Sequence, residues 1–160
     1  MDMNTHLIAY GLLAALAIAV LYAGITDLRH RKITNRLTGA IAIAAPLFWW
    51  ASGLSIWPGV AIQIALAAGW FVFGALLFKI GQMGGGDVKL ITAVALWLPP
   101  FALLDMLLLM SLLGGALTLL FLIERRWRRS EGPIEVPYGV AIALAGLLMV
   151  HEPLLNHFHR

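Results

Sequence analysis

The sequence contains no cysteine, and only 12% of its 160 residues are charged. The absence of cysteine excludes structural disulfides and Cys-ligated zinc sites. The scarcity of charge, together with 61% hydrophobic residues and a mean hydropathy of +0.90, excludes a soluble domain of this size. We therefore expect an integral membrane protein, with residues 1–160 forming a single membrane-embedded domain.

Long apolar runs predict an all-α, polytopic membrane helix bundle with about six transmembrane helices. The longest run covers 36 residues, from 88 to 123. As one helix it would measure roughly 54 Å, against a hydrocarbon core of about 30 Å, and Pro99-Pro100 divides it. The expected spans lie at about residues 7–25, 37–52, 60–78, 88–98, 101–123 and 136–150.

Positive charge is placed very unevenly between the expected loops. If the spans alternate in direction, ten of the eleven Lys and Arg residues fall on one side of the membrane and only Arg160 falls on the other. The positive-inside rule assigns the basic side to the cytoplasm, with both termini outside it, in a multi-pass protein of the cell inner membrane. Orientation accounts for the basic loops better than a nucleic-acid or anionic-lipid patch does, so we expect no nucleic-acid partner. Membrane lipid is an expected partner because the spans lie in the bilayer.

Two aspartates are expected at the same boundary of this bundle. Asp27 ends the first span, and Asp87 follows Gly84, Gly85 and Gly86 at the start of the fourth. Glycines let another backbone approach closely, which favours a loop that presents Asp87 to an extended peptide or to a second carboxylate. The alternative is a flexible turn whose aspartate merely starts the next helix.

A carboxylate pair at membrane depth is a candidate functional site. Ionisable groups are costly there, and two neighbouring carboxylates do not ionise together easily, so one keeps its proton. An aspartic protease uses this arrangement, with one Asp as the base for water and the other as the acid toward the scissile carbonyl. A small proton-coupled transporter or channel subunit using Asp27 and Asp87 as a relay is the main alternative, and an interaction-only scaffold is the third.

Three short motifs carry a family resemblance. They are Asp27 with Arg31, Ile33 and Asn35; the run from Gly84 through Asp87 and Lys89 to Leu90; and Val136-Pro137-Tyr138-Gly139. Together they resemble the type IV prepilin peptidases, which are intramembrane aspartic proteases with a GxGD motif. The chain is most similar to the short members that serve Flp/Tad-type pili or archaeal-type filaments.

This resemblance implies that Asp27 and Asp87 are the catalytic pair of an endopeptidase. The implied partner is a prepilin or pseudopilin, a short protein whose basic leader ends in Gly ahead of an apolar helix and is removed at the cytoplasmic membrane face. Gly84, Gly85, Gly86, Lys89 and Asn35 are the expected substrate-positioning or loop-positioning residues. Lys89 could instead simply extend to the membrane surface.

The sequence also departs from the family pattern. Thr34 and Val140 stand where many relatives have proline, which affects loop stiffness more than chemistry. Longer members carry a four-Cys zinc domain and methylate the new N-terminus. This chain lacks those cysteines and that length, so we expect no methyltransferase activity, no cofactor and no metal site. The tail histidines, His151, His157 and His159, are expected to be surface residues.

Overall fold

The computed structural model describes residues 3–128 and 138–158, and all regular structure in these ranges is helical. Six α-helices and one π-helical turn follow one another in these ranges, and the hydropathy pattern predicted about six helices. Their bounds are α1 Met3–His30, α2 Asn35–Ala51, the π-turn η1 Ile56–Val60, α3 Ala61–Lys79, α4 Gly85–Ala95, α5 Pro100–Arg128 and α6 Tyr138–Phe158.

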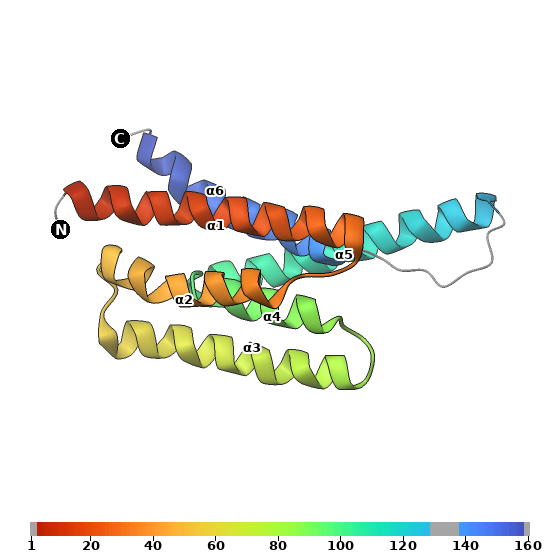
Figure 1. The fold of residues 1–160 in the computed structure, drawn as a ribbon, viewed down its shortest axis with the longest axis horizontal. Helices are drawn as coiled ribbons and strands as arrows, with labels where there is room; N and C mark the ends of the chain where they lie inside the picture. The colour runs from red at the N-terminus through yellow and green to blue at the C-terminus, as the bar shows by residue number, and fades with distance from the viewer. Residues whose placement is uncertain (1–2, 129–137, 159–160) are drawn as a thin grey trace.

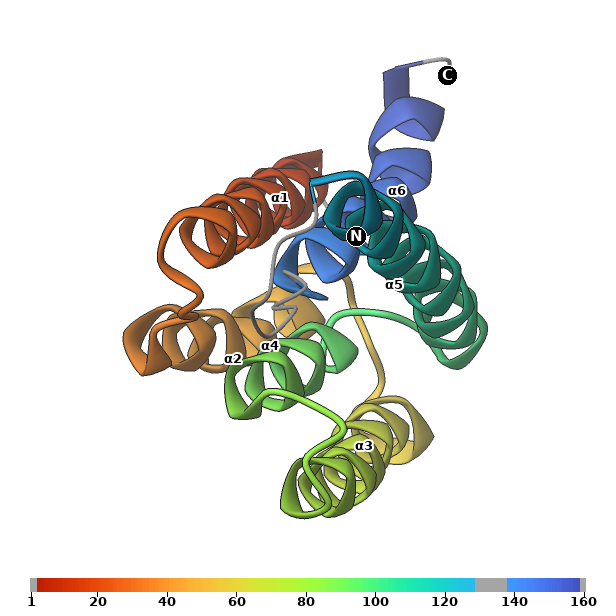
Figure 2. The ribbon, with the colours of Figure 1, turned by 90° about the vertical axis from the view of Figure 1, so that its right-hand side faces the viewer.

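Consecutive helices run in opposite directions along the long axis of the molecule (Figure 1). The ends of α1, α3 and α5 and the starts of α2, α4 and α6 therefore lie toward one end of the bundle. The principal packing pairs are α1 with α6, α5 with α6, α3 with α4, and α2 with both α1 and α4. Figure 2 shows α4 near the middle of this arrangement, with α2 and α3 beside it.

The helices differ in whether they are long enough to cross a membrane. In the described part of the chain, three segments are long and apolar enough to do so: Asn4–His30, Ile56–Lys79 and Pro100–Glu124. Helix α4 has only 11 residues, or about 16 Å, which is roughly half of a 30 Å hydrocarbon core. A helical membrane bundle is thus confirmed, while α4 is a short helix held among longer ones.

Some helix ends differ from the sequence prediction. Pro100 is the first residue of α5, since proline has no N–H to lose at that position and its φ already suits a helix. Helix α5 continues beyond residue 123 to Arg128, and α6 continues beyond residue 150 to Phe158. The hydropathy pattern marks the apolar stretch of a helix, but a helix continues through polar residues where its backbone bonding allows.

The core fixes α4 in position. Leu90, Ile91 and Val94 are fully buried. Two indole hydrogen bonds also join α2 to the end of α4 and the residues after it: Trp49 Nε1 donates to the Leu96 carbonyl at 2.7 Å, and Trp97 Nε1 donates to the Ile41 carbonyl at 3.0 Å. A buried apolar face and two long-range hydrogen bonds leave α4, and the aspartate at its start, little freedom to move.

Candidate active site

Asp87 lies in the first turn of α4. Gly84 is the N-cap, and Gly85 and Gly86 are already helical, so the glycine loop expected from the sequence is instead mainly a helix start. Glycine has a low helix propensity, but a helix can begin at these three glycines because tertiary packing of α4 stabilises it. The Asp87 carboxylate accepts a hydrogen bond from the backbone N–H of Gly84. An acidic residue at the third helical position commonly bonds the N-cap N–H in this way, as in a capping box.

Each of these three glycines also makes room for a neighbour. A Cβ on Gly84 would lie 2.8 Å from Asp87 Oδ2, closer than real contacts allow. A Cβ on Gly85 would lie 3.3 Å from the Phe78 ring, and one on Gly86 would lie 3.1 Å from Ile33 Cβ. The absence of side chains therefore lets the start of α4 approach the end of α3 and the α1–α2 linker.

Asp27 lies in the last turn of α1 and is held by the start of α6. Gly139 N–H donates a hydrogen bond of 2.9 Å to Asp27 Oδ2. A Cβ on Gly139 would lie 2.7 Å from both the Cβ and Oδ2 of Asp27, so only glycine fits this contact without displacement. The donor is one of the free N–H groups that every helix N-terminus presents.

Gly139 holds Asp27 in place, yet the sequence prediction gave this residue no role. It belongs to the Tyr138-Gly139 motif noted in the sequence, and that motif was the available signal. Its neighbours in the motif, Val136 and Pro137, lie outside the described residues.

The linker from α1 to α2, residues 31–34, lies beside the two aspartates. Arg31 has a positive φ of 54°, and its N–H donates to the Asp27 carbonyl at 2.8 Å, which ends α1. Thr34 is the N-cap of α2, with its side chain accepting from Leu37 N–H at 3.4 Å. Thr34 therefore has a structural role of its own, as the cap of α2.

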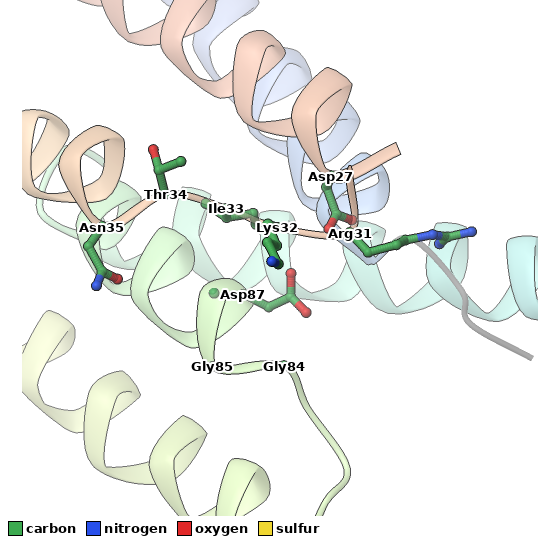
Figure 3. A pocket seen from close by; sticks show the side chains of 10 residues that line it. Asp27, Arg31, Lys32, Ile33, Thr34, Asn35, Gly84, Gly85 and Asp87 are labelled. Atoms are coloured by element: carbon green, nitrogen blue, oxygen red, sulfur yellow. The ribbon is translucent and has the colours of Figure 1, made fainter. Parts of the chain in front are cut away.

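The two carboxylates line one pocket of about 440 Å³. Figure 3 shows Asp27 and Asp87 directed toward the same space from α1 and α4, with the linker beside them. Both side chains are largely buried, at 8% and 9% exposure. The structure thus brings together two residues that lie 60 positions apart in the sequence. The remaining lining residues are Arg31, Lys32, Ile33, Thr34, Asn35, Gly84, Gly85 and Gly86.

Lys89 and Asn35 meet at the exposed rim of this region. Lys89 Nζ donates to Asn35 Oδ1 at 2.9 Å, joining α4 to the first residue of α2. Asn35 lines the pocket with the aspartates, whereas Lys89 does not. Lys89 is therefore the one expected positioning residue that does not line the pocket, and it contacts the pocket through Asn35.

The environment of Asp87 changes its acidity. Asp87 precedes the apolar part of α4, and α4 is not one of the three segments able to cross a membrane. Burial, assisted by the nearby Asp27 carboxylate and opposed by the Gly84 hydrogen bond, raises the pKa of Asp87 from 3.8 to about 7. A carboxylic acid with such a pKa retains a proton near neutrality and can donate it.

In residues 3–128 and 138–158, no three His, Cys, Asp or Glu residues cluster in a way that could hold a metal ion. His159 lies outside the described residues, and so do the side chains of His151 and His157. Asp105, on α5, is exposed and is not among the residues that line the pocket. The two buried aspartates are therefore the acidic groups around which this pocket is built.

The fold and the site define a helical membrane protein with a buried pair of carboxylates at one end of its bundle. The type IV leader peptidase family model matches residues 14–119. The chain belongs to this family. The match covers both aspartates and ends before α6, which supplies the Gly139 contact.

A curated relative supports the same assignment. The chain is 29% identical over 143 residues to a prepilin leader peptidase/N-methyltransferase of Xanthomonas campestris pv. campestris. The alignment covers 86% of this chain and 48% of the relative, so the chain spans about half the length of that protein. No solved structure matches the chain.

Proposed function

We propose that this protein is a membrane aspartic endopeptidase that removes the basic leader peptide from type IV prepilin-like proteins. The observation that carries the proposal is the placement of Asp27 and Asp87 in one pocket. The family assignment and the name of the Xanthomonas relative supply the substrate class. The proposal includes peptide hydrolysis only and does not extend to methyl transfer.

In the proposed mechanism the two aspartates have different tasks. Asp27 Oδ2 already accepts the Gly139 N–H, so the Asp27 carboxylate is oriented as the base that takes a proton from the attacking water. Asp87 donates its proton to the scissile carbonyl oxygen as the water oxygen bonds to the carbonyl carbon. The resulting diol collapses when the C–N bond breaks, and the departing nitrogen receives a proton from the pair.

The proposed active site faces the cytoplasm. In Figure 1 the ends of α1 and α3 and the starts of α2 and α4 lie at the same end of the bundle, and Arg29, Arg36 and Lys79 belong to these segments. Such clustering of positive charge favours the cytoplasmic side, with both termini on the other. A basic leader would then be cut on the side where it is synthesised.

Leader removal by the purified protein is the direct test. A prepilin-like substrate with a basic leader that ends in glycine should be shortened in the presence of EDTA, because the proposed chemistry uses two carboxylates and water. Cleavage is followed by the mobility shift of the substrate, with substrate alone as the control. Loss of cleavage on chelation and its recovery with zinc would contradict the aspartic mechanism.

The pH dependence follows from the raised pKa of Asp87. The protonated form of Asp87 is the proposed acid, so it is available below pH 7 and is lost as pH rises through about 7. We expect kcat/KM to fall by about tenfold per pH unit well above that value, and to fall again at low pH once the pair binds a second proton. Initial rates measured from pH 4 to 10 check this. A rate that keeps rising to pH 10 would exclude protonated Asp87 as the acid.

A further inference from the structure

A second cavity adjoins the pocket that contains the aspartates. This cavity, here called the α2–α4 groove, has a volume of about 330 Å³. Helix α2 lines it with Asn35, Thr38, Gly39 and Ala42. Helix α4 and its C-cap residue Leu96 line it with residues at the same i, i+3, i+4, i+7 spacing, which are Lys89, Thr92, Ala93 and Leu96. Phe71 of α3 completes the lining. One face of each helix therefore borders the groove.

The groove leads away from the aspartates. Helices α2 and α4 both start at the end of the bundle that holds Asp87, and they run in the same direction (Figure 1). Asn35 and Lys89 thus form the near end of the groove, and Ala42 and Leu96 form its far end. Seven residues of helix span about 10 Å, so the groove extends about two helical turns along the bundle.

Beyond its mouth, the groove presents an apolar surface. Its two hydroxyl groups are already bonded within their own helices: Thr38 Oγ1 donates to the Asn35 carbonyl, and Thr92 Oγ1 donates to the Val88 carbonyl. Gly39 has no heavy atom within 4 Å of where its Cβ would lie, so the groove is open at this point. An occupant would therefore meet mainly methyl groups and one aromatic ring.

The mouth of the groove is shared with the proposed active site. Asn35 lines both cavities, and Lys89, which lines the groove, donates a hydrogen bond to Asn35 at this shared edge. A chain bound across the aspartates can therefore continue directly into the groove. The positive charge of Lys89 disfavours the basic leader of the substrate at this entrance. It therefore favours entry of the apolar helix that follows the leader.

We propose that the α2–α4 groove binds the apolar helical segment that follows the scissile bond of the substrate. This inference rests on the proposed function and adds the surface that recognises the substrate after its leader. Binding of that helix would place the preceding peptide bond at the aspartates, since Asn35 connects the two cavities.

A third cavity, which is also apolar, serves as a comparison for the α2–α4 groove. It has a volume of about 460 Å³, lies between α3 and α5, and includes Gly69. It is larger than the α2–α4 groove but shares no lining residue with the pocket of the aspartates. Gly69, like Gly39, has open space around its Cβ position. The two glycines are therefore matched sites for filling one cavity or the other.

The test compares Gly39→Leu with Gly69→Leu in the full-length protein. Leucine favours helix more than glycine does, so both variants should fold and insert. With an intact prepilin-like substrate, Gly39→Leu should raise KM by at least about tenfold, equivalent to 1.4 kcal/mol, and change kcat little. With a short peptide that ends a few residues after the cleavage site, Gly39→Leu should differ from wild type less than about twofold, as should Gly69→Leu on either substrate.

Cross-linking locates the bound helix without relying on turnover. Because the chain has no cysteine, Gly39→Cys and Gly69→Cys each introduce a single thiol. Substrate variants with one cysteine in the first two turns of the apolar helix should form a disulfide with Gly39→Cys and not with Gly69→Cys. A disulfide at Gly69 in place of Gly39 would overturn the proposal in favour of the α3–α5 cavity.

The remaining outcomes separate the two proposals. If wild-type protein cleaves neither substrate, the proposed function fails. If wild-type protein cleaves the intact substrate and Gly39→Leu cleaves it equally well, the function stands and the groove has another occupant, such as a lipid chain. Equal losses on the intact and the short substrate would show that Gly39→Leu disturbs the catalytic pocket, which also contradicts the docking proposal.

Discussion

Asp27→Asn and Asp87→Asn are each expected to lower the rate of leader cleavage by at least about a hundredfold, because proton transfer by a positioned side chain contributes roughly 10²- to 10⁴-fold. Asparagine is close to aspartate in size but neither takes up nor gives up a proton in this chemistry. The double variant should be little worse than either single variant, since groups that act as one unit are not additive. Co-expression with a prepilin-like substrate and its mobility shift measure the effect.

Asp105→Asn is the matched control for these variants. Asp105 is an exposed aspartate on α5 and lines none of the cavities described above. Its replacement should leave cleavage within about twofold of wild type, the size of effect expected away from the reacting groups. Each variant must also be present in the membrane at the wild-type level. Normal processing by either Asp27→Asn or Asp87→Asn would refute the paired mechanism and would make a proton relay in a transporter the leading interpretation.

Gly139→Ala is expected to reduce cleavage by about a hundredfold, because a displacement of about 1 Å at a catalytic group can cost this much. The added methyl group would lie 2.7 Å from Asp27 Cβ and Oδ2, so either Asp27 or the start of α6 must move. Such a movement also lengthens the 2.9 Å hydrogen bond that orients the carboxylate. Steady-state kinetics should show the loss chiefly in kcat.

Gly115→Ala distinguishes this displacement from a general effect of alanine. Gly115 is a helical glycine on α5 with nothing within 4 Å of its Cβ position. Alanine is the better helix former at both positions, so neither variant should lose helical structure. Gly115→Ala should retain wild-type kinetics. If Gly139→Ala did as well, the Gly139 contact would have no part in positioning Asp27.

The sequence alone determined the class of protein and the separation of its helices. Hydropathy is a property of local composition, so 61% hydrophobic residues and a set of apolar runs were enough to predict a helical membrane bundle. Pro99-Pro100 marked the boundary before α5 because the constraint of proline on its own backbone is also local. The GGGD, Asn35 and Tyr-Gly motifs were sufficient to suggest the type IV prepilin peptidase family.

The sequence could also place Asp27 and Asp87 at the same end of the bundle, because alternation of helices fixes which ends lie together. It could not show that both line one pocket, because this depends on how α1 and α4 pack against α2 and α6. Nor could it show that the three glycines begin a helix: their local preference is for irregular backbone, and burial of α4 overrides it.

Only the tertiary structure identified the partner of Asp27. Gly139 lies 112 positions further along the chain, and its N–H reaches Asp27 Oδ2 only because α6 packs along α1. The Lys89–Asn35 bond and the groove beside it likewise depend on the parallel placement of α2 and α4. Contacts of this kind arise from the shapes of helix surfaces far apart in sequence, which no local pattern of residues encodes.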